Sequence, residues 1–105
     1  MTINKEKNGT ALTVALEGRL DTTTAPELEN VLTFSLEDVT SLVFDFNKLD
    51  YISSAGLRVL LSAQKTMRTK GDMKVIGVNE VINEIFEVTG FNDILDVELA
   101  GDAEE

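Results

Sequence analysis

The 105-residue sequence contains no cysteine and no histidine. Without cysteine, the chain has no disulfide framework and no thiolate nucleophile, which is consistent with a cytoplasmic protein. Without either residue type, Ser-His-Asp triads, Cys-His pairs and the common zinc sites are excluded. The glycine-rich phosphate-binding patterns Gly-x-x-x-x-Gly-Lys-Ser/Thr and Gly-x-Gly-x-x-Gly are also missing. We therefore expect a protein that is not an enzyme and that uses no cofactor and no metal.

Positive charge is scarce as well, since 9 Lys and Arg oppose 19 Asp and Glu and give a formal net charge of −10. Nucleic acids and anionic membrane surfaces attract basic proteins, so neither is an expected partner. The charge favours a partner with a basic face, and it would equally serve to keep the domain soluble. No apolar run approaches the roughly 20 residues of a membrane span, and the N-terminus lacks a signal-peptide pattern. We expect no direct membrane insertion and a cytoplasmic location.

The sequence does contain enough apolar residues for one packed domain. Its hydrophobic fraction is 43%, and its length lies near the commonest domain size. We expect a single domain over residues 1–105, in which the acidic stretch from about 100 to 105 forms a frayed tail.

Apolar segments with strand character occur at residues 11–16, 42–46 and 73–78. The turn signal of Asn8 and Gly9 adds a strand before the first of these, as the other half of a hairpin. Residues 91–99 predict a final short strand or helical turn. With helices between the later strands, this order predicts an α/β domain. Its sheet should be mixed and four- to five-stranded, with an N-terminal hairpin and helices packed on it.

Three helices are expected from 3.6-residue spacing and from their boundary signals. The first opens with a capping box at residues 24–27, with Pro26 in its first turn. The second ends near residue 70, with Gly71 as its left-handed terminator. The third runs from an N-cap at Asn79 to a stop at Gly90.

Two consecutive serines, Ser53 and Ser54, separate the strand at 42–46 from the second helix. In an open α/β sheet this places them at the carboxyl end of a strand, where such folds usually carry their sites. We expect at least one of the two hydroxyls to cap the helix by accepting a free backbone N–H of the first turn. A helix N-terminus also tolerates a phosphate, and a capping serine can be a phosphoacceptor too.

Residues 50–57 resemble the phosphoacceptor segment of the STAS domain family, the anti-sigma factor antagonists of bacteria. That segment typically runs hydrophobic-Asp-Ser-Ser/Thr-Gly-Leu. In the family, the serine after the aspartate is phosphorylated by the cognate anti-sigma factor, which is a serine kinase. The resemblance places the acceptor at Ser54 and the family's glycine at Gly56. It places the family's aspartate at Ser53 and its second Ser/Thr at Ala55, so these two residues depart from the pattern.

Two other segments carry the same resemblance. Gly18, Leu20 and Asp21 match a Gly-x-Leu-Asp segment, which in the family lies beside the phosphoacceptor and takes part in the partner surface. Considered by chemistry alone, Asp21 is equally a solvated turn carboxylate. Residues 86–91 are similar to the family's Phe-x-x-Ser/Thr-Gly-Leu segment.

The resemblance implies an anti-sigma factor antagonist that acts by partner switching in transcription regulation. Unphosphorylated, it would bind an anti-sigma factor serine kinase and release the sigma factor. Phosphorylation at Ser54 would switch it off, and a serine phosphatase would reset it. The implied partner surface consists of Asp21, Ser53, Ser54, Ala55, Gly56, Leu57 and Arg58.

Two of these residues also support expectations from chemistry. Because Gly56 has no Cβ, it lets the helix start lie close to another backbone, so Gly56→Val should damage partner binding more than folding. Arg58 is a cation in the first turn, where it opposes the helix dipole. It is either an exposed arginine whose stem covers apolar surface, or a contact for an acidic partner group or for a phosphate at Ser54, four residues earlier.

Two alternatives remain at this point. The first is a STAS-like scaffold subunit of a membrane transport or signalling assembly, without phosphoryl chemistry. The second is a response-regulator receiver with its phosphoacceptor at Asp45 or Asp50. Receivers also need an acidic pair after the first strand to hold magnesium, and the corresponding loop offers only Asp21.

Overall fold

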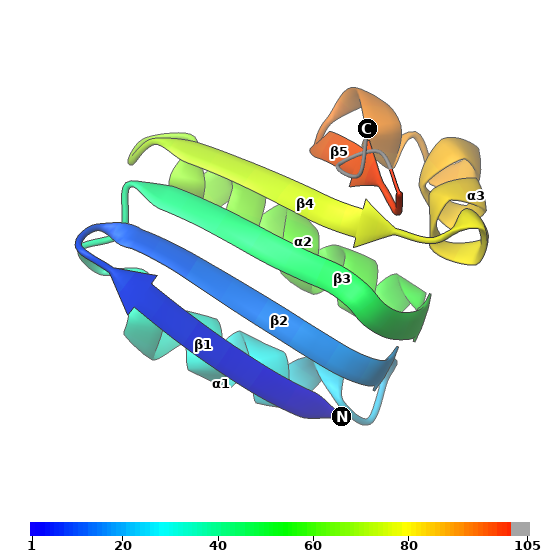
Figure 1. Cartoon of the computed structure of the whole chain (residues 1–105), viewed down its shortest axis with the longest axis horizontal. Coiled ribbons are helices and arrows are strands. Elements are labelled where there is room, and N and C mark those ends of the chain that lie inside the picture. The colour runs from blue at the N-terminus through cyan, green and yellow to red at the C-terminus, as the bar shows by residue number, and fades with distance from the viewer. Residues whose placement is uncertain (102–105) are drawn as a thin grey trace.

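The sheet is built in sequence order, β1-β2-β3-β4-β5, so each strand lies beside its neighbour in the chain (Figure 1). A computed structural model describes residues 1–101 and contains the strands β1 (Thr2–Asn8), β2 (Ala11–Leu20), β3 (Ser41–Ile52), β4 (Asp72–Val78) and β5 (Asp96–Leu99). β1 and β2 form an antiparallel hairpin, and every later neighbouring pair is parallel. The predicted mixed sheet with an N-terminal hairpin is confirmed, with five strands.

The helices are α1 (Ala25–Ser35), α2 (Ser54–Met67) and α3 (Glu80–Thr89), and a short 3-10 helix η1 spans Phe91–Asp93. α1 and α2 lie side by side behind the same face of the sheet, while α3 lies beyond the end of β4 (Figure 1). None of the helices among residues 1–101 has the length and apolar character that crossing a bilayer would need.

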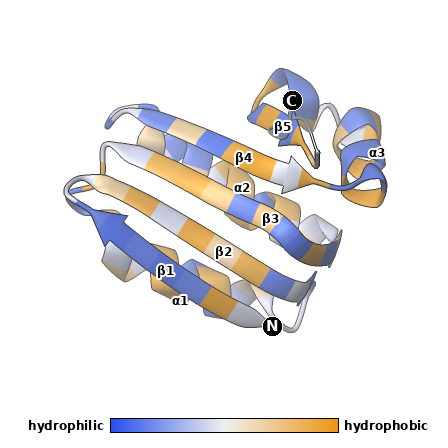
Figure 2. Cartoon of the chain, in the orientation of Figure 1, coloured by the Kyte–Doolittle hydropathy of each residue, from blue (hydrophilic) through white to orange (hydrophobic). Residues whose placement is uncertain are grey.

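The core fills the space between the sheet and α1 and α2. Burial alternates along the first parts of β2 and β3, and each buried position there carries an apolar residue. Apolar and polar bands along the strands can be followed in Figure 2. The largest contributions come from Leu16, Phe44, Phe46, Leu28, Leu60 and Phe86. Along β2 and β3 up to residue 46, the intervening positions are exposed or half-buried, because no helix among the described residues covers that face (Figure 1).

β2 and β3 are longer than the sequence predicted. The expected strands at 11–16 and 42–46 continue to Leu20 and Ile52. Irregular register at two points keeps the strands paired along this extension. Leu20, Leu49 and Ile52 are buried there, and their burial favours strand over loop.

The end of α2 also differs from expectation. The helix ends at Met67, and Gly71 is not among the glycines with positive φ, so Gly71 is not its left-handed terminator. A Cβ on Gly71 would collide with the carbonyl oxygen of Thr40. Glycine is needed here for the close approach of the chain to that oxygen. The stop at Gly90 is confirmed, with φ of 80°.

The C-terminal segment contains both of the expected alternatives, since the 3-10 helix η1 precedes the short strand β5. Ala100 then donates its N–H to the carbonyl of Val78 at 2.8 Å, so the first residue of the expected frayed tail is held to β4. Residues 102–105 of that tail lie outside the described residues.

Candidate functional site

The two serines lie where β2 and β3 end together. Ser53 directly follows β3, and its N–H donates to the carbonyl of Leu20, the last residue of β2, at 2.9 Å. Ser54 is the first residue of α2 and is exposed. The predicted position at the carboxyl end of a strand is confirmed.

The predicted serine cap is wrong in its chemistry. Ser53 occupies the N-cap position with extended backbone, but its side chain makes no capping hydrogen bond. Its Oγ is buried and has no hydrogen-bond partner. No hydrogen bond among the described residues involves the Ser54 hydroxyl either. The backbone N–H groups of the first turn of α2 therefore have no side-chain acceptor.

The first turn of α2 is consequently electropositive. A helix N-terminus carries a partial positive charge, and no acidic residue in this turn offsets it. Arg58 is exposed one turn after Ser54, so its cation is available to solvent or to a partner. The arrangement suits an anion at Ser54, which is where a phosphoserine would be.

Gly56 and Leu57 lie beneath this surface. Both are buried, and a Cβ on Gly56 would lie 2.7 Å from Cγ of Leu20 and 2.8 Å from Cγ1 of Ile52. Glycine therefore allows the start of α2 to pack on the ends of β2 and β3. The expected damage of Gly56→Val shifts from partner binding to folding, because the new side chain would overlap the core. Of the expected partner-binding residues, Ser54 and Arg58 are exposed and Ala55 is half-buried.

Asp21 has a structural role at the end of β2. Its Oδ1 accepts the N–H of Thr23 at 3.0 Å and that of Thr24 at 3.2 Å, which makes a tight turn into α1. The hydrogen bond from the Thr24 backbone lowers the pKa of Asp21 below its ordinary value, and partial burial opposes this. Arg19 Nε lies 3.9 Å from the other carboxylate oxygen.

The predicted capping box at residues 24–27 is wrong for a related reason. Thr24 is the N-cap residue of α1, but its side chain makes no cap hydrogen bond. Its hydroxyl donates to the carbonyl of Arg19 and accepts the N–H of Asp21, each at 2.8 Å. The turn held by Asp21 thus uses the hydroxyl that a capping box would need. Pro26 lies in the first turn, as predicted.

A pair of residues that sequence reasoning missed lies at the same end of the sheet. The guanidinium carbon of Arg19 lies 4.5 Å from the ring centroid of Tyr51, at a distance typical of a cation–π contact. The two residues are register partners in β2 and β3, just before the serines. The shifts in register between β2 and β3 place Arg19 opposite Tyr51. No pattern in the sequence predicts these shifts.

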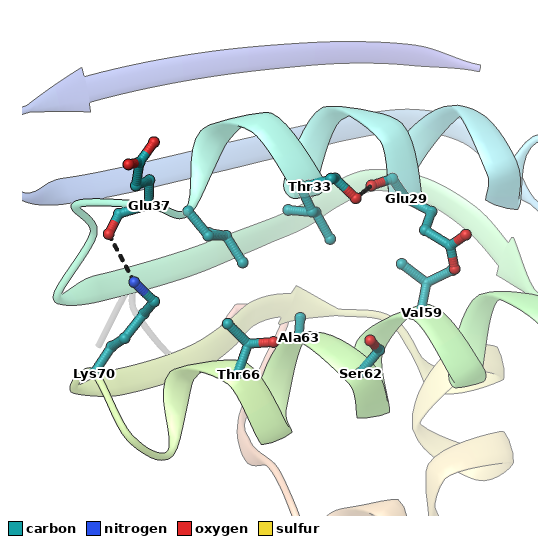
Figure 3. A pocket seen from close by; sticks show the side chains of 10 residues that line it. Glu29, Thr33, Glu37, Val59, Ser62, Ala63, Thr66 and Lys70 are labelled. Atoms are coloured by element: carbon teal, nitrogen blue, oxygen red, sulfur yellow. Dashed lines mark hydrogen bonds between the residues drawn. The ribbon is translucent and has the colours of Figure 1, made fainter.

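A groove of about 470 Å³ lies between α1 and α2 (Figure 3), and neither serine lines it. There, Lys70 Nζ donates to the carbonyl of Glu37 at 2.7 Å and Thr33 donates to that of Glu29 at 2.9 Å.

Within residues 1–101, no three acidic side chains converge on a possible metal position. Asp45, one of the alternative acceptors, receives hydrogen bonds from Asn47.

Comparison with known proteins identifies the family. The STAS domain model matches residues 2–103. The anti-sigma-B factor antagonist of Staphylococcus aureus is 33% identical over 86 residues, which are 80% of each chain.

Solved structures share the fold. An anti-sigma factor antagonist from Mycobacterium paratuberculosis superposes with a TM-score of 0.86 at 21% identity, covering 97% of this chain and 88% of that one. The anti-sigma factor antagonist SpoIIAA in its unphosphorylated form superposes with a TM-score of 0.82 at 16% identity, covering 98% and 91%. The chain therefore belongs to the STAS domain family, whose anti-sigma factor antagonists are regulatory proteins and not enzymes.

Proposed function

We propose that this protein is an anti-sigma factor antagonist controlled by phosphorylation of Ser54. Unphosphorylated, it binds an anti-sigma factor of the serine-kinase type and displaces the sigma factor. The observation that carries the proposal is the exposed Ser54 in a first helical turn whose N–H groups have no side-chain acceptor. The name of the S. aureus relative supports the same function.

Phosphorylation would convert the hydroxyl of Ser54 into a dianionic ester. The Ser54 oxygen attacks the γ-phosphorus of ATP, the bond to the β-phosphate oxygen breaks, and ADP leaves. The hydroxyl proton passes to a base on the kinase. The product carries about −1.5 to −2 charges, which the N-terminus of α2 stabilises. Ser53 is a poor acceptor, because its Oγ is buried.

The negative charge of the phosphate on Ser54 would dissociate the complex with the anti-sigma factor kinase. In the unphosphorylated complex, Ser54 lies inside the interface and is removed from water. A phosphate at this position would have to lose its hydration, which costs several kcal/mol unless a cation pairs with it. Release of the partner restores its hydration. A serine phosphatase resets the switch by directing water to the phosphorus, which frees inorganic phosphate and the hydroxyl.

The experiment uses the purified chain with the kinase-type anti-sigma factors of its own organism and ATP. Peptide mapping should find phosphate on Ser54 in the wild type and in Ser53→Ala, and none in Ser54→Ala. Ser54→Ala should still bind the kinase, whereas Ser54→Asp should bind at least tenfold more weakly, or about 1.4 kcal/mol. Phosphate on Ser53, or equal binding by all variants, would contradict the proposal. Equal binding is the result expected of a scaffold subunit.

A further inference from the structure

α3 carries a line of three apolar side chains, two of which are exposed. At 3.6 residues per turn, Val81, Ile85 and Val88 fall on one stripe of the helix, which we name the α3 stripe. Val81 is 53% exposed and Val88 is 83% exposed, while Ile85 is half-buried. Within residues 1–101, two of the five exposed large hydrophobic residues therefore lie on this ten-residue helix.

The core contacts of α3 come mainly from other side chains, although Ile85 is partly buried against the core. Its core face is made by Ile82 and Phe86, both fully buried. Its start is capped by Asn79, and its end is closed by Gly90 in the left-handed conformation. A shallow hollow of about 310 Å³ lies along the stripe, lined by Val81, Glu84, Ile85, Val88 and Thr89. The stripe is thus apolar surface with a concave shape on an element that is otherwise complete.

The charge beside the α3 stripe has one sign. Glu80, Glu84 and Glu87 are exposed and follow one side of it, and the helix contains no Lys or Arg. An acidic border repels an anionic membrane surface and a second copy of this chain, whose net charge is −10. It attracts an apolar protein surface with a basic border.

The stripe and Ser54 belong to the same end of the molecule. α2 follows β3 and α3 follows β4, and these two strands are parallel neighbours, so both helices begin at one edge of the sheet (Figure 1). Asn79 ties the two regions together, because its Nδ2 donates to the carbonyl of Leu49 at 3.0 Å, five residues before Ser54. The start of α3 therefore lies beside the last part of β3, which leads into Ser54.

We propose that the α3 stripe is a second docking surface for the anti-sigma factor kinase, and that the kinase meets it with an apolar patch bordered by Lys or Arg. The inference rests on the proposed function and extends it. Phosphorylation changes the charge at Ser54 and leaves the stripe as it was. The stripe therefore supplies affinity that is independent of the switch and holds Ser54 at the kinase active site.

The test places a cation in the stripe. Val88→Lys should weaken binding of the unphosphorylated chain to the kinase at least tenfold. It should raise KM for phosphorylation of Ser54 while kcat stays unchanged. Phe34→Lys is the matched control, because Phe34 is 85% exposed and lies near the end of α1, where the strands begin. Val88→Ser adds no charge and should lose less of the affinity for the kinase than Val88→Lys. The melting temperatures of all three variants should lie within a few degrees of that of the wild type.

The outcomes separate the inference from the function on which it rests. If Val88→Lys binds the kinase like the wild type while Ser54→Asp binds more weakly, the second docking surface is refuted. The proposed phosphorylation switch at Ser54 is then still supported. If the wild type binds none of the kinase-type anti-sigma factors, the proposed function itself fails. A wild-type dimer in sedimentation that Val88→Lys dissociates would assign the stripe to self-association and overturn the inference. Equal losses for Phe34→Lys and Val88→Lys would also overturn it, because the effect would then not be specific to the stripe.

Discussion

The starts of α2 and α3 are built in opposite ways, although each follows a parallel strand and each has a polar N-cap residue. Asn79 accepts the N–H of Ile82 at 2.8 Å and donates to the carbonyl of Leu49 at 3.0 Å. Ser53 holds the equivalent position before α2, but its buried hydroxyl has no hydrogen-bond partner. In the first turn of α3, the Asn79 side chain accepts a backbone N–H. In the first turn of α2, no side chain does so.

The start of α1 is a third case, in which the N-cap residue Thr24 makes no side-chain cap hydrogen bond but a carboxylate holds the preceding turn. There the carboxylate of Asp21 accepts the N–H groups of Thr23 and Thr24, just before the helix. Side chains thus organise the starts of the two helices that have no proposed modification. The start without such a side chain is the one that carries Ser54. Each of the following changes tests a part of this contrast between the helix starts.

The largest effect is expected for Gly56→Val. The first atom of the new side chain would lie 2.7 Å from Leu20 and 2.8 Å from Ile52, so α2 must move away from the sheet. Overpacking of this kind costs about 1–3 kcal/mol or more of unfolding free energy. Urea denaturation followed by circular dichroism measures the loss. Gly9→Val provides the control for a valine without a clash, because no atom lies within 4 Å of its Cβ position; its positive φ adds only backbone strain. A stable Gly56→Val that fails to bind the kinase would restore the role in binding that the sequence suggested.

The next effect compares the two N-cap residues directly. Asn79→Ala removes two hydrogen bonds and should lower the unfolding free energy by about 1–2 kcal/mol. Ser53→Ala removes a buried hydroxyl that has no partner, so it should be neutral or slightly stabilising. Thermal denaturation of both variants under identical conditions gives the comparison. A loss for Ser53→Ala as large as that for Asn79→Ala would show that Ser53 caps α2 in solution.

A pH-dependent effect is expected for Asp21. Its hydrogen bond from Thr24 lowers its pKa in the folded state below the ordinary 3.8, so the ionised form favours folding. This contribution is complete above about pH 5 and disappears as the pH falls through the lowered pKa. Asp21→Asn keeps an acceptor oxygen but removes the titration. The stability difference between wild type and Asp21→Asn should therefore be constant near neutrality and shrink below about pH 4.

Asp38 serves as the control for that measurement. Its carboxylate pairs with Lys7 at 2.6 Å, and this hydrogen bond also lowers its pKa. The Asp21→Asn variant still contains Asp38, so its unfolding free energy should still fall in acid as Asp38 becomes protonated. A difference between wild type and Asp21→Asn that does not change from pH 7 to pH 2 would show that the charge of Asp21 plays no part in the turn.

The smallest effect on stability is expected for Arg58→Ala. The side chain is exposed and lies in the first turn, so its removal should change the unfolding free energy by less than about 1 kcal/mol. Its effect on kinase binding should be larger at low salt than at high salt, because exposed charges are screened. Surface plasmon resonance at 50 and 500 mM salt, about 14 and 4 Å in Debye length, measures it. Unchanged binding at low salt would leave Arg58 as a surface arginine.

Local signals in the sequence predicted the elements that depend on neighbouring residues. The hairpin, the cap at Asn79 and the stop at Gly90 each need only a few consecutive residues to form. The capping box at residues 24–27 failed for a local reason, because the Thr24 hydroxyl bonds to Arg19 and Asp21. Other failures occurred where a distant segment decides the outcome. Gly71 is explained by Thr40, more than thirty residues earlier, and the strand after Phe46 is explained by pairing with β2.

The candidate site follows the same division. The position of Ser54 came from the order of strand, serines and helix, which is local. The buried hydroxyl of Ser53, the contact of Arg19 with Tyr51 and the core position of Gly56 came from the meeting of β2, β3 and α2. These depend on register and close packing, which apolar periodicity does not specify.

The sequential order of the strands has a consequence for synthesis on the ribosome. In β1-β2-β3-β4-β5, each strand pairs with the one before it, and no strand has to insert between two that are already paired. As the chain emerges, every new strand finds its edge already formed, and the helix between two strands can settle before the next arrives. The hairpin of β1 and β2 closes a short loop, whereas the register partners in β2 and β3 lie about thirty residues apart, which slows their pairing. The protein is thus able to assemble from its N-terminus to its C-terminus, with α3, η1 and β5 added last.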